Sequence, residues 1–307
     1  MKRIHVEHET IYTYESEVQL AHHLAYLSPI TNSYQEVISN HINISPAPDT
    51  HQQNLDVFGN KRDFFSFHKS HQSLNVTSTC EVISKSIPSE LIQRIDHTWE
   101  AIRDSLKYSA SKSFLPASEF IYPSPFAPYA KEIKSYAEKS FTPGRKLTDA
   151  SIELCERIFK DFQYSPNSTE INTPVWQAFE RKKGVCQDFA HIFIVAIRSI
   201  GLSAKYISGY LLTTPPPGQE KLRGADASHA WISIYCPGIP GDWLELDPTN
   251  NMIADSNHVR LAIGRDFGDV SPLRGVIRGG GDHELSVAVT AEEIDPQQLI
   301  IQKENLN

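Results

Sequence analysis

One stretch of the sequence, GVCQDFAHIFIVAIRSIG, constrains the fold more than any other. From Cys186 onward its apolar residues recur at steps of three and four, the period of a half-buried helix. Gly184 precedes this helix, and Gly201 is a natural stop after it. Cys186 therefore lies in the first helical turn, where unpaired backbone N–H groups and the helix dipole favour a thiolate and could hold an oxyanion. Taken alone, a single cysteine on a helix is more often a small buried apolar residue.

Two further reactive residues follow in a predicted hairpin. The segment HAWISIY begins at His229, the segment WLELD ends at Asp247, and CPGIPGD between them is turn material. If the turn is centred near Gly238, His229 stands directly opposite Asp247 with both side chains on one face. A carboxylate in that position would hold the imidazole, whereas a register slip of one residue would separate them. Each residue also has an ordinary role, since a histidine can simply begin a strand and an aspartate before proline can initiate a turn.

The motifs around these residues resemble a known family. GVCQDFAH, SGYL, TTPPPG, DASHAW, LDPTN and GRDFGDVSP occur in this order and are similar to motifs of the bacterial branch of the transglutaminase-like superfamily, whose members are relatives of papain-type cysteine proteases. The resemblance runs from the N-terminal strands to about Val289. It implies that Cys186, His229 and Asp247 form a catalytic triad, the same residues that the hairpin argument selects. It says less about the substrate, because the superfamily includes cross-linkers, proteases, amidases and inactive binding modules.

We expect an α+β fold in three parts. Residues 1–86 contain alternating, β-rich runs that predict an N-terminal β-rich domain. Residues 87–130, with their prolines and aromatic residues, predict a connector. Residues 131–307 are the expected catalytic domain, closed by a strand near HELSVAVT. The resemblance implies a papain- or transglutaminase-like core, in which the helix bearing the cysteine packs on an antiparallel sheet bearing the histidine and the aspartate.

Charge and cysteine content limit the partners and the compartment. The 307 residues carry 29 Lys and Arg against 37 Asp and Glu, a net charge of −8. This balance argues against binding to nucleic acid or to an anionic membrane. No apolar run has membrane-spanning length, and the N-terminus lacks the apolar core of a signal peptide. Four cysteines in such a chain favour a reducing compartment, so we expect a cytoplasmic protein. The oligomeric state stays open.

Several other residues are weaker candidates. Gln187 and Asp226 are possible substrate contacts, and the loop 213–224 could gate the site or merely connect two strands. Asp188 is most simply a carboxylate that compensates the helix dipole, and His191 a packed group rather than the base. The glycines at 279–281 predict a turn. The thirteen histidines form no HExxH motif, so we predict neither a metal nor another cofactor.

The chemistry that these residues favour is two-step acyl transfer. A thiolate of Cys186 would attack the carbonyl of a peptide or protein amide, His229 would protonate the leaving amine, and a thioester would form. Water as the acceptor makes the protein a cysteine protease or amidase, which we favour because no calcium-site pattern is visible. An amine acceptor would make it a protein-glutamine transglutaminase. A non-catalytic peptide-binding module on the same fold is the remaining alternative.

Overall fold

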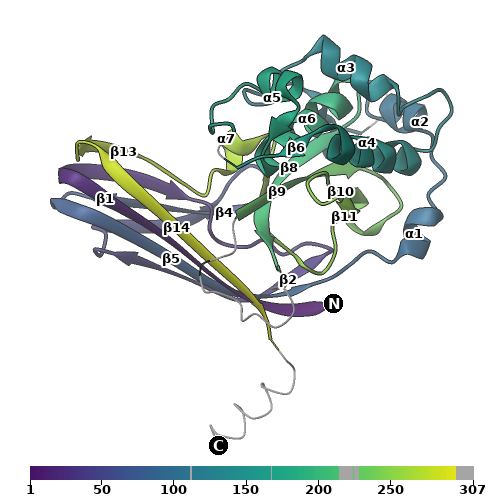
Figure 1. Cartoon of the computed structure of the whole chain (residues 1–307). Helices are drawn as coiled ribbons and strands as arrows, with labels where there is room; N and C mark the ends of the chain where they lie inside the picture. The colour runs from purple at the N-terminus through teal and green to yellow at the C-terminus, as the bar shows by residue number, and fades with distance from the viewer. Residues whose placement is uncertain (111–112, 167, 214–223, 225–227, 295–307) are drawn as a thin grey trace, which may run out of the picture.

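The computed structural model describes residues 1–110, 113–166, 168–213, 224 and 228–294. It places them in two antiparallel sheets, a short parallel strand pair and a layer of helices (Figure 1). The helices are α1 (Ser89–Gln93), α2 (Trp99–Ser105), η1 (Pro116–Ile121), α3 (Lys131–Glu138), α4 (Leu147–Asp161), α5 (Val175–Arg181), α6 (Cys186–Ser199), η2 (Pro240–Asp242) and α7 (Phe267–Val270). Among the described residues, none of the helices has the length and apolar character needed to cross a membrane.

The strands divide between the sheets as follows. The first sheet contains β1 (Lys2–Ala25), β2 (Gln35–Ser45), β3 (Thr50–Leu55), β4 (Lys61–Phe67), β5 (His71–Ser84), β13 (Leu273–Gly279) and β14 (His283–Glu293). The second contains β8 (Ala204–Leu211), β9 (Ser228–Tyr235), β10 (Trp243–Asp247), β11 (Met252–Ile253) and β12 (His258–Gly264). The parallel pair is β6 (Gln163–Tyr164) with β7 (Lys183–Gly184).

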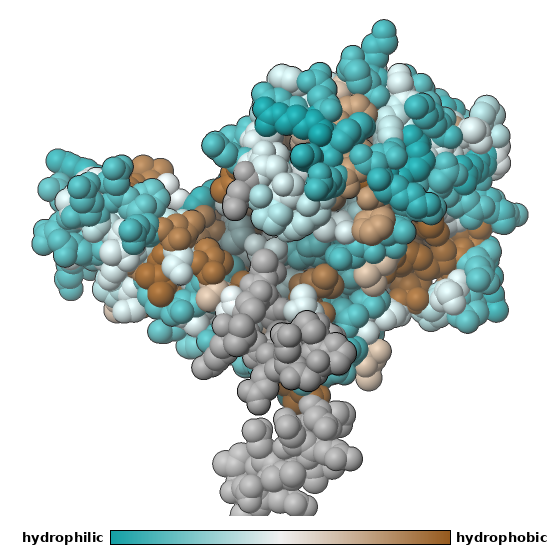
Figure 2. Space-filling model, in the orientation of Figure 1, coloured by the Kyte–Doolittle hydropathy of each residue, from teal (hydrophilic) through white to brown (hydrophobic). Residues whose placement is uncertain are grey.

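The first sheet is organised around the long strand β1. Alternate residues of its first part, from Ile4 to Thr10, are buried, as expected for a strand with one face on a core. β5 and β14 flank this first part, and β4 and β13 flank the second part. Part of the sheet projects away from the helical layer (Figure 1). Figure 2 shows apolar residues exposed on this projection, where Leu285 and Val287 of β14 are about half exposed.

The last two strands differ from the sequence-based expectation. The sequence assigns residues 131–307, with the HELSVAVT strand, to the catalytic domain, but β13 and β14 pair with β1 of the first sheet. Pairing between the two ends of a chain leaves no local pattern in the sequence. It forms because the edge of β1 would otherwise present unpaired backbone N–H and C=O groups.

The three glycines that connect these strands, where the sequence predicts a turn, lie opposite residues 15–17 of β1. β13 and β14 pair with consecutive parts of β1, since Gly279 pairs with Val18 and His283 pairs with Tyr14. The φ angles of Gly279, Gly280 and Gly281 are 91°, 91° and 63°, in the region that favours glycine. The glycines therefore accommodate the irregular part of β1 that lies opposite them.

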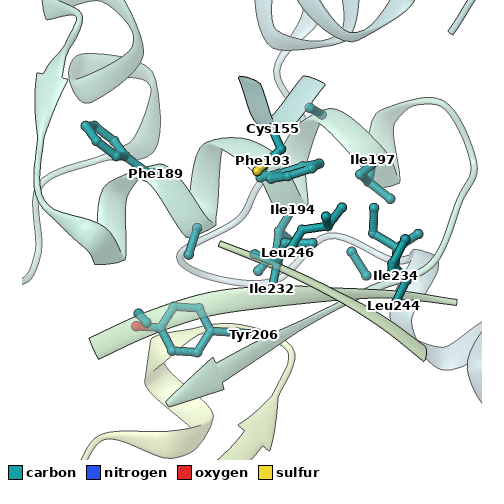
Figure 3. Packing of buried hydrophobic residues seen from close by; sticks show 14 of the residues in the cluster. Cys155, Phe189, Phe193, Ile194, Ile197, Tyr206, Ile232, Ile234, Leu244 and Leu246 are labelled. Carbon is teal, nitrogen blue, oxygen red and sulfur yellow. The ribbon is translucent and has the colours of Figure 1, made fainter. Parts of the chain in front are cut away.

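The second sheet supports the helix that begins at Cys186. Its strand order is β11-β10-β9-β8-β12, and α6 packs across one face (Figure 3). Phe193, Ile194 and Ile197 of α6 meet Ile232 and Leu246 of the sheet in one buried cluster. Burial of such side chains contributes roughly 1.5–3 kcal/mol each. Most of α6 is buried, not half of it as the sequence predicts, because α3, α4 and α5 contact it as well.

The N-terminal residues and the connector also pack onto this core. Ile4 and Val82 of the first sheet belong to the same buried cluster as α6. Residues 87–130, predicted to be an extended connector, contain α1, α2 and η1, and Ile102 and Phe120 in them are buried. The first sheet is thus fixed against the second, while its projecting part has a separate core cluster.

Candidate active site

The first turn of α6 is held by its own carboxylate. Asp188, 3% exposed, accepts hydrogen bonds from the backbone N–H of Val185 at 2.8 Å and from the Thr169 hydroxyl at 2.7 Å. A side chain on Gly184 would collide with this carboxylate, since a Cβ there would lie 2.6 Å from Oδ2 of Asp188. Asp188 therefore lies in the first turn, where the sequence predicts a carboxylate that compensates the helix dipole, and it also makes a capping hydrogen bond. This arrangement fixes the position of Cys186.

Cys186 differs from the other three cysteines in its exposure. Its side chain is partly exposed, whereas Cys80, Cys155 and Cys236 are buried. Burial raises the pKa of Cys80 and Cys236 to about 12, and it raises the pKa of Cys155 further. The buried thiols are thus neutral and inaccessible at neutral pH. Cys186 is the thiol that a solute can reach.

The hairpin forms, but with a register two residues away from the predicted one. β10 pairs with β9 so that Leu246 faces Ile232, whereas a turn centred at Gly238 would place it opposite Ala230. His229 and Asp247 are therefore diagonal neighbours rather than direct partners. Because side chains alternate with a period of two, a shift of two residues keeps both on the same face. Nε2 of His229 lies 2.7 Å from Oδ2 of Asp247.

Asp247 is fully buried and its oxygens are saturated with hydrogen bonds. Oδ1 accepts from the backbone N–H groups of Thr249 at 2.9 Å and Asn250 at 3.3 Å. Oδ2 accepts from His229, from the Asn250 amide at 2.7 Å, and from Nε2 of His258 at 3.2 Å. Burial alone would raise the pKa of Asp247, but the bonds from His229 and His258 hold it well below its usual range. Asp247 is therefore an ionised carboxylate in a dry site.

His229 connects this carboxylate to the thiol. Burial alone lowers the pKa of His229, but hydrogen bonds to Asp247 and to Cys186 raise the pKa to about 10. Since Nε2 is bound to Asp247, Nδ1 is the ring nitrogen that remains for Cys186. A histidine with this pKa carries a proton at neutral pH. The structure thus brings Cys186, His229 and Asp247 together, with the imidazole between the thiol and the carboxylate.

Two residues near these three escaped the sequence analysis. His258 of β12 is fully buried; its Nε2 lies 3.2 Å from Oδ2 of Asp247, and its Nδ1 lies 3.1 Å from the backbone nitrogen and 3.2 Å from Oδ1 of Asp255. Trp231 stacks on His229 with ring centroids 5.9 Å apart. The period of a strand could have predicted Trp231, two residues after His229. No local pattern indicates His258, which reaches the site from another strand.

His229, Asp247 and His258 also resemble a set of metal ligands. Their candidate ligand atoms lie within 4.8 Å of one another. The same atoms are already joined by hydrogen bonds of 2.7 and 3.2 Å, and Asp247 receives further hydrogen bonds from its own turn. The donor set therefore has a complete explanation as a proton-sharing network.

The weaker candidates have different outcomes. The amide of Gln187 donates to the carbonyl of Ile171 at 3.1 Å, so this side chain is tied to a neighbouring loop at the start of α6. Asp226 and most of the loop 213–224 lie outside the described residues. His191 is buried, accepts from the N–H of Phe267 at 3.2 Å, and has a pKa lowered to about 4 by burial. It is a packed group, as its position in the helix predicts.

Comparison with known proteins finds two family matches and several relatives. Residues 4–83 match the family described as the bacterial transglutaminase-like N-terminal region, and residues 134–248 match the transglutaminase-like superfamily. An uncharacterized protein of Mycobacterium tuberculosis is 35% identical over 300 residues, which cover 95% of this chain and 94% of the relative. One from Mycobacterium leprae is 29% identical over 292 residues, covering 94% and 98%. The crystal structure of a "putative cysteine protease" from Cytophaga hutchinsonii has a TM-score of 0.74 and 17% identity, covering 96% of this chain and 91% of its own, and shares the fold.

Proposed function

Since this chain belongs to the transglutaminase-like superfamily, we propose that it is a thiol acyl-transfer enzyme, a cysteine protease or amidase with Cys186 as its nucleophile. The observation that carries the proposal is the series from the partly exposed thiol of Cys186 through His229 to the buried carboxylate of Asp247. A nucleophile, a base and an orienting group in hydrogen-bond contact are the minimum for this chemistry. The solved structure from Cytophaga hutchinsonii, described as a protease, supports the same class.

The first half-reaction forms a thioester. The raised pKa of His229 favours an imidazolium beside a thiolate, so that Sγ of Cys186 attacks the amide carbonyl carbon while its oxygen becomes an oxyanion. N–H groups of the first turn of α6, with that of Cys186 foremost, are the candidate donors to this oxyanion. The tetrahedral intermediate collapses, the C–N bond breaks, and the imidazolium gives its proton to the leaving amine.

The second half-reaction returns the thiol. Neutral His229 removes a proton from water, the water oxygen attacks the thioester carbon, and the C–S bond breaks to release a carboxylic acid. Asp247 stays ionised throughout, because the hydrogen bonds from His229 and His258 hold its pKa low despite its burial, and it orients the imidazole. The transferred acyl group thus ends on water, which makes the net reaction hydrolysis of an amide.

Digestion of an unbiased peptide library tests this proposal. We expect wild-type protein to cleave peptides with a chelator present, and Cys186→Ala to lose cleavage completely. Cys80→Ala is the matched control, because Cys80 is buried in the first sheet and should be dispensable for turnover. Cleavage that persists in Cys186→Ala would refute the proposed nucleophile.

A second assay separates the two acceptors. Incorporation of a fluorescent primary amine into a glutamine-bearing protein should be slight compared with hydrolysis. Incorporation that depends on Cys186 and exceeds hydrolysis would replace the protease assignment with a transglutaminase. Loss of both activities across broad substrate sets would instead favour the binding module.

A further inference from the structure

A second site lies on the other face of the sheet that supports α6. An open cavity of about 270 Å³ lies between the segment 30–34, the turn at Phe58 and the strands β8, β9 and β10. Lys205, Ser233 and Glu245 line it. They alternate along their strands with residues that face α6, so they belong to the opposite face of the sheet. The walls come from both sheets of the molecule.

The cation on the wall of this cavity, Lys205, lies against aromatic rings. Nζ of Lys205 lies 3.6 Å from the ring centroid of Trp243 and 4.9 Å from that of Phe120. Among the residues that the structure describes, Lys205 has no hydrogen-bonding or ion-pair partner. Burial lowers the pKa of Lys205 to about 8, and Glu245 partly offsets this effect. Lys205 is partly exposed, so a ligand in the cavity can reach its ammonium group. A negatively charged acceptor there would form a charge-assisted hydrogen bond with it.

The nearby carboxylate is not available to be that acceptor. Both oxygens of Glu245 accept from Nε of Arg260, at 3.1 and 2.9 Å, and one of them also accepts from the Trp231 indole at 3.0 Å. Arg260 is 1% exposed and neutralises Glu245. Lys205 therefore remains as the uncompensated charge on this wall.

We propose that the cavity binds a small monocarboxylate with an apolar body, whose carboxylate is received by Lys205 and Ser233. Lys205 and Ser233 are paired residues of β8 and β9, so their side chains lie on one face as neighbours. One ammonium and one hydroxyl suit the two oxygens of a carboxylate. Ile207, Phe58 and Trp243 supply apolar wall for the rest of the molecule. A phosphate dianion fits less well, since Lys205 offers one positive charge against its two.

Calorimetric titration of the full chain with benzoate tests the site. We expect saturable binding to the wild type, and binding weaker by about tenfold or more for benzamide, which lacks the charge. Lys205→Met should weaken benzoate binding by a similar factor. Lys182→Met is the matched control, because Nζ of Lys182 also stacks on aromatic rings, 3.9 Å from Phe179 and 4.1 Å from Phe162, but outside this cavity. It should bind benzoate like the wild type.

A measurement on the wild type alone covers the case in which Lys205→Met fails to fold. An amine-reactive acetylating reagent is applied with and without benzoate, and modified lysines are mapped by mass spectrometry. Benzoate should slow the modification of Lys205 and leave that of Lys182 unchanged. The proposal is overturned if benzoate neither binds nor protects, if benzamide binds equally well, or if inorganic phosphate binds in preference to benzoate. None of these readouts depends on the reaction at Cys186.

Discussion

Two buried carboxylates lie two residues apart on β10 and behave in opposite ways. Asp247 is bound by the imidazoles of His229 and His258, and one of these imidazoles continues to a partly exposed thiol. Glu245 accepts hydrogen bonds from the guanidinium of Arg260 and from the indole of Trp231, and neither donor leads to a thiol. Imidazoles can gain or lose a proton near neutral pH, whereas a guanidinium cannot. Under the proposed function, the partners of a carboxylate, not its place in the sheet, decide whether it orients a proton-transferring imidazole or only stabilises the fold.

The largest contrast is expected in turnover when each carboxylate is converted to its amide. Asp247→Asn removes the charge that orients and stabilises the His229 imidazolium, so turnover should fall on the order of 10³- to 10⁴-fold. Amide hydrolysis under saturating substrate measures this effect, and circular dichroism checks the fold. A folded Asp247→Asn protein with near wild-type turnover would remove Asp247 from the proposed mechanism.

Glu245→Gln should show the reverse pattern. The substitution leaves the buried guanidinium of Arg260 without its counter-charge, which costs about 3–5 kcal/mol in the free energy of unfolding. Turnover of the folded fraction should remain within about tenfold of the wild type, because Glu245 contacts neither Cys186 nor His229. Urea denaturation tests the predicted loss of stability, and turnover at low urea tests the predicted retention of activity. A large loss of turnover with unchanged stability would make the two carboxylates equivalent after all.

Substitution of His258 should have a smaller effect on turnover, because His258 contacts the carboxylate of Asp247 rather than the substrate. His258→Leu removes one donor to Asp247 and should lower kcat about tenfold with little change in KM. His258→Gln keeps an N–H donor of similar reach and should recover part of that loss. If both variants lower kcat equally, His258 acts through packing against Trp231, with which it makes an edge contact at 5.0 Å.

The last expected effect is a pH dependence of stability, which is measured as a change in Tm rather than in turnover. The pKa of His229 is raised from 6.5 to about 10 in the folded protein. A raised pKa stabilises the folded state fully below pH 6.5, and this contribution is lost as the pH rises towards 10. Thermal denaturation between pH 6.5 and 10 should therefore show a decline of Tm in the wild type that is reduced in His229→Gln. The same decline in both proteins would assign it to other groups.

The parts of the site that local patterns encode were predictable from the sequence. The start of α6 at Cys186 follows from its apolar spacing, and the shared face of His229 and Asp247 follows from the strand period. The register was not predictable, because it depends on the turn. Gly241 and Asp242 there have φ angles of 75° and 60°, a local conformation that shifts the pairing.

The remaining differences all involve pairing between distant segments. His258 reaches Asp247 because β12 pairs with β8, and β8 with β9, an order that no motif in the sequence specifies. The return of β13 and β14 to the first sheet is of the same kind. The cavity around Lys205 also needs walls from both sheets. Local sequence patterns carry no signal for such contacts.

Alkylation of the four thiols tests the central claim most directly. Wild-type protein and His229→Ala are treated with iodoacetamide at pH 7, and the modified cysteines are mapped by mass spectrometry over time. The proposed thiolate–imidazolium pair predicts rapid modification of Cys186 in the wild type, much slower modification of Cys186 in His229→Ala, and almost none at Cys80, Cys155 and Cys236. Equal rates at all four thiols, or a Cys186 rate that is unchanged in His229→Ala, would contradict the claim that His229 activates Cys186.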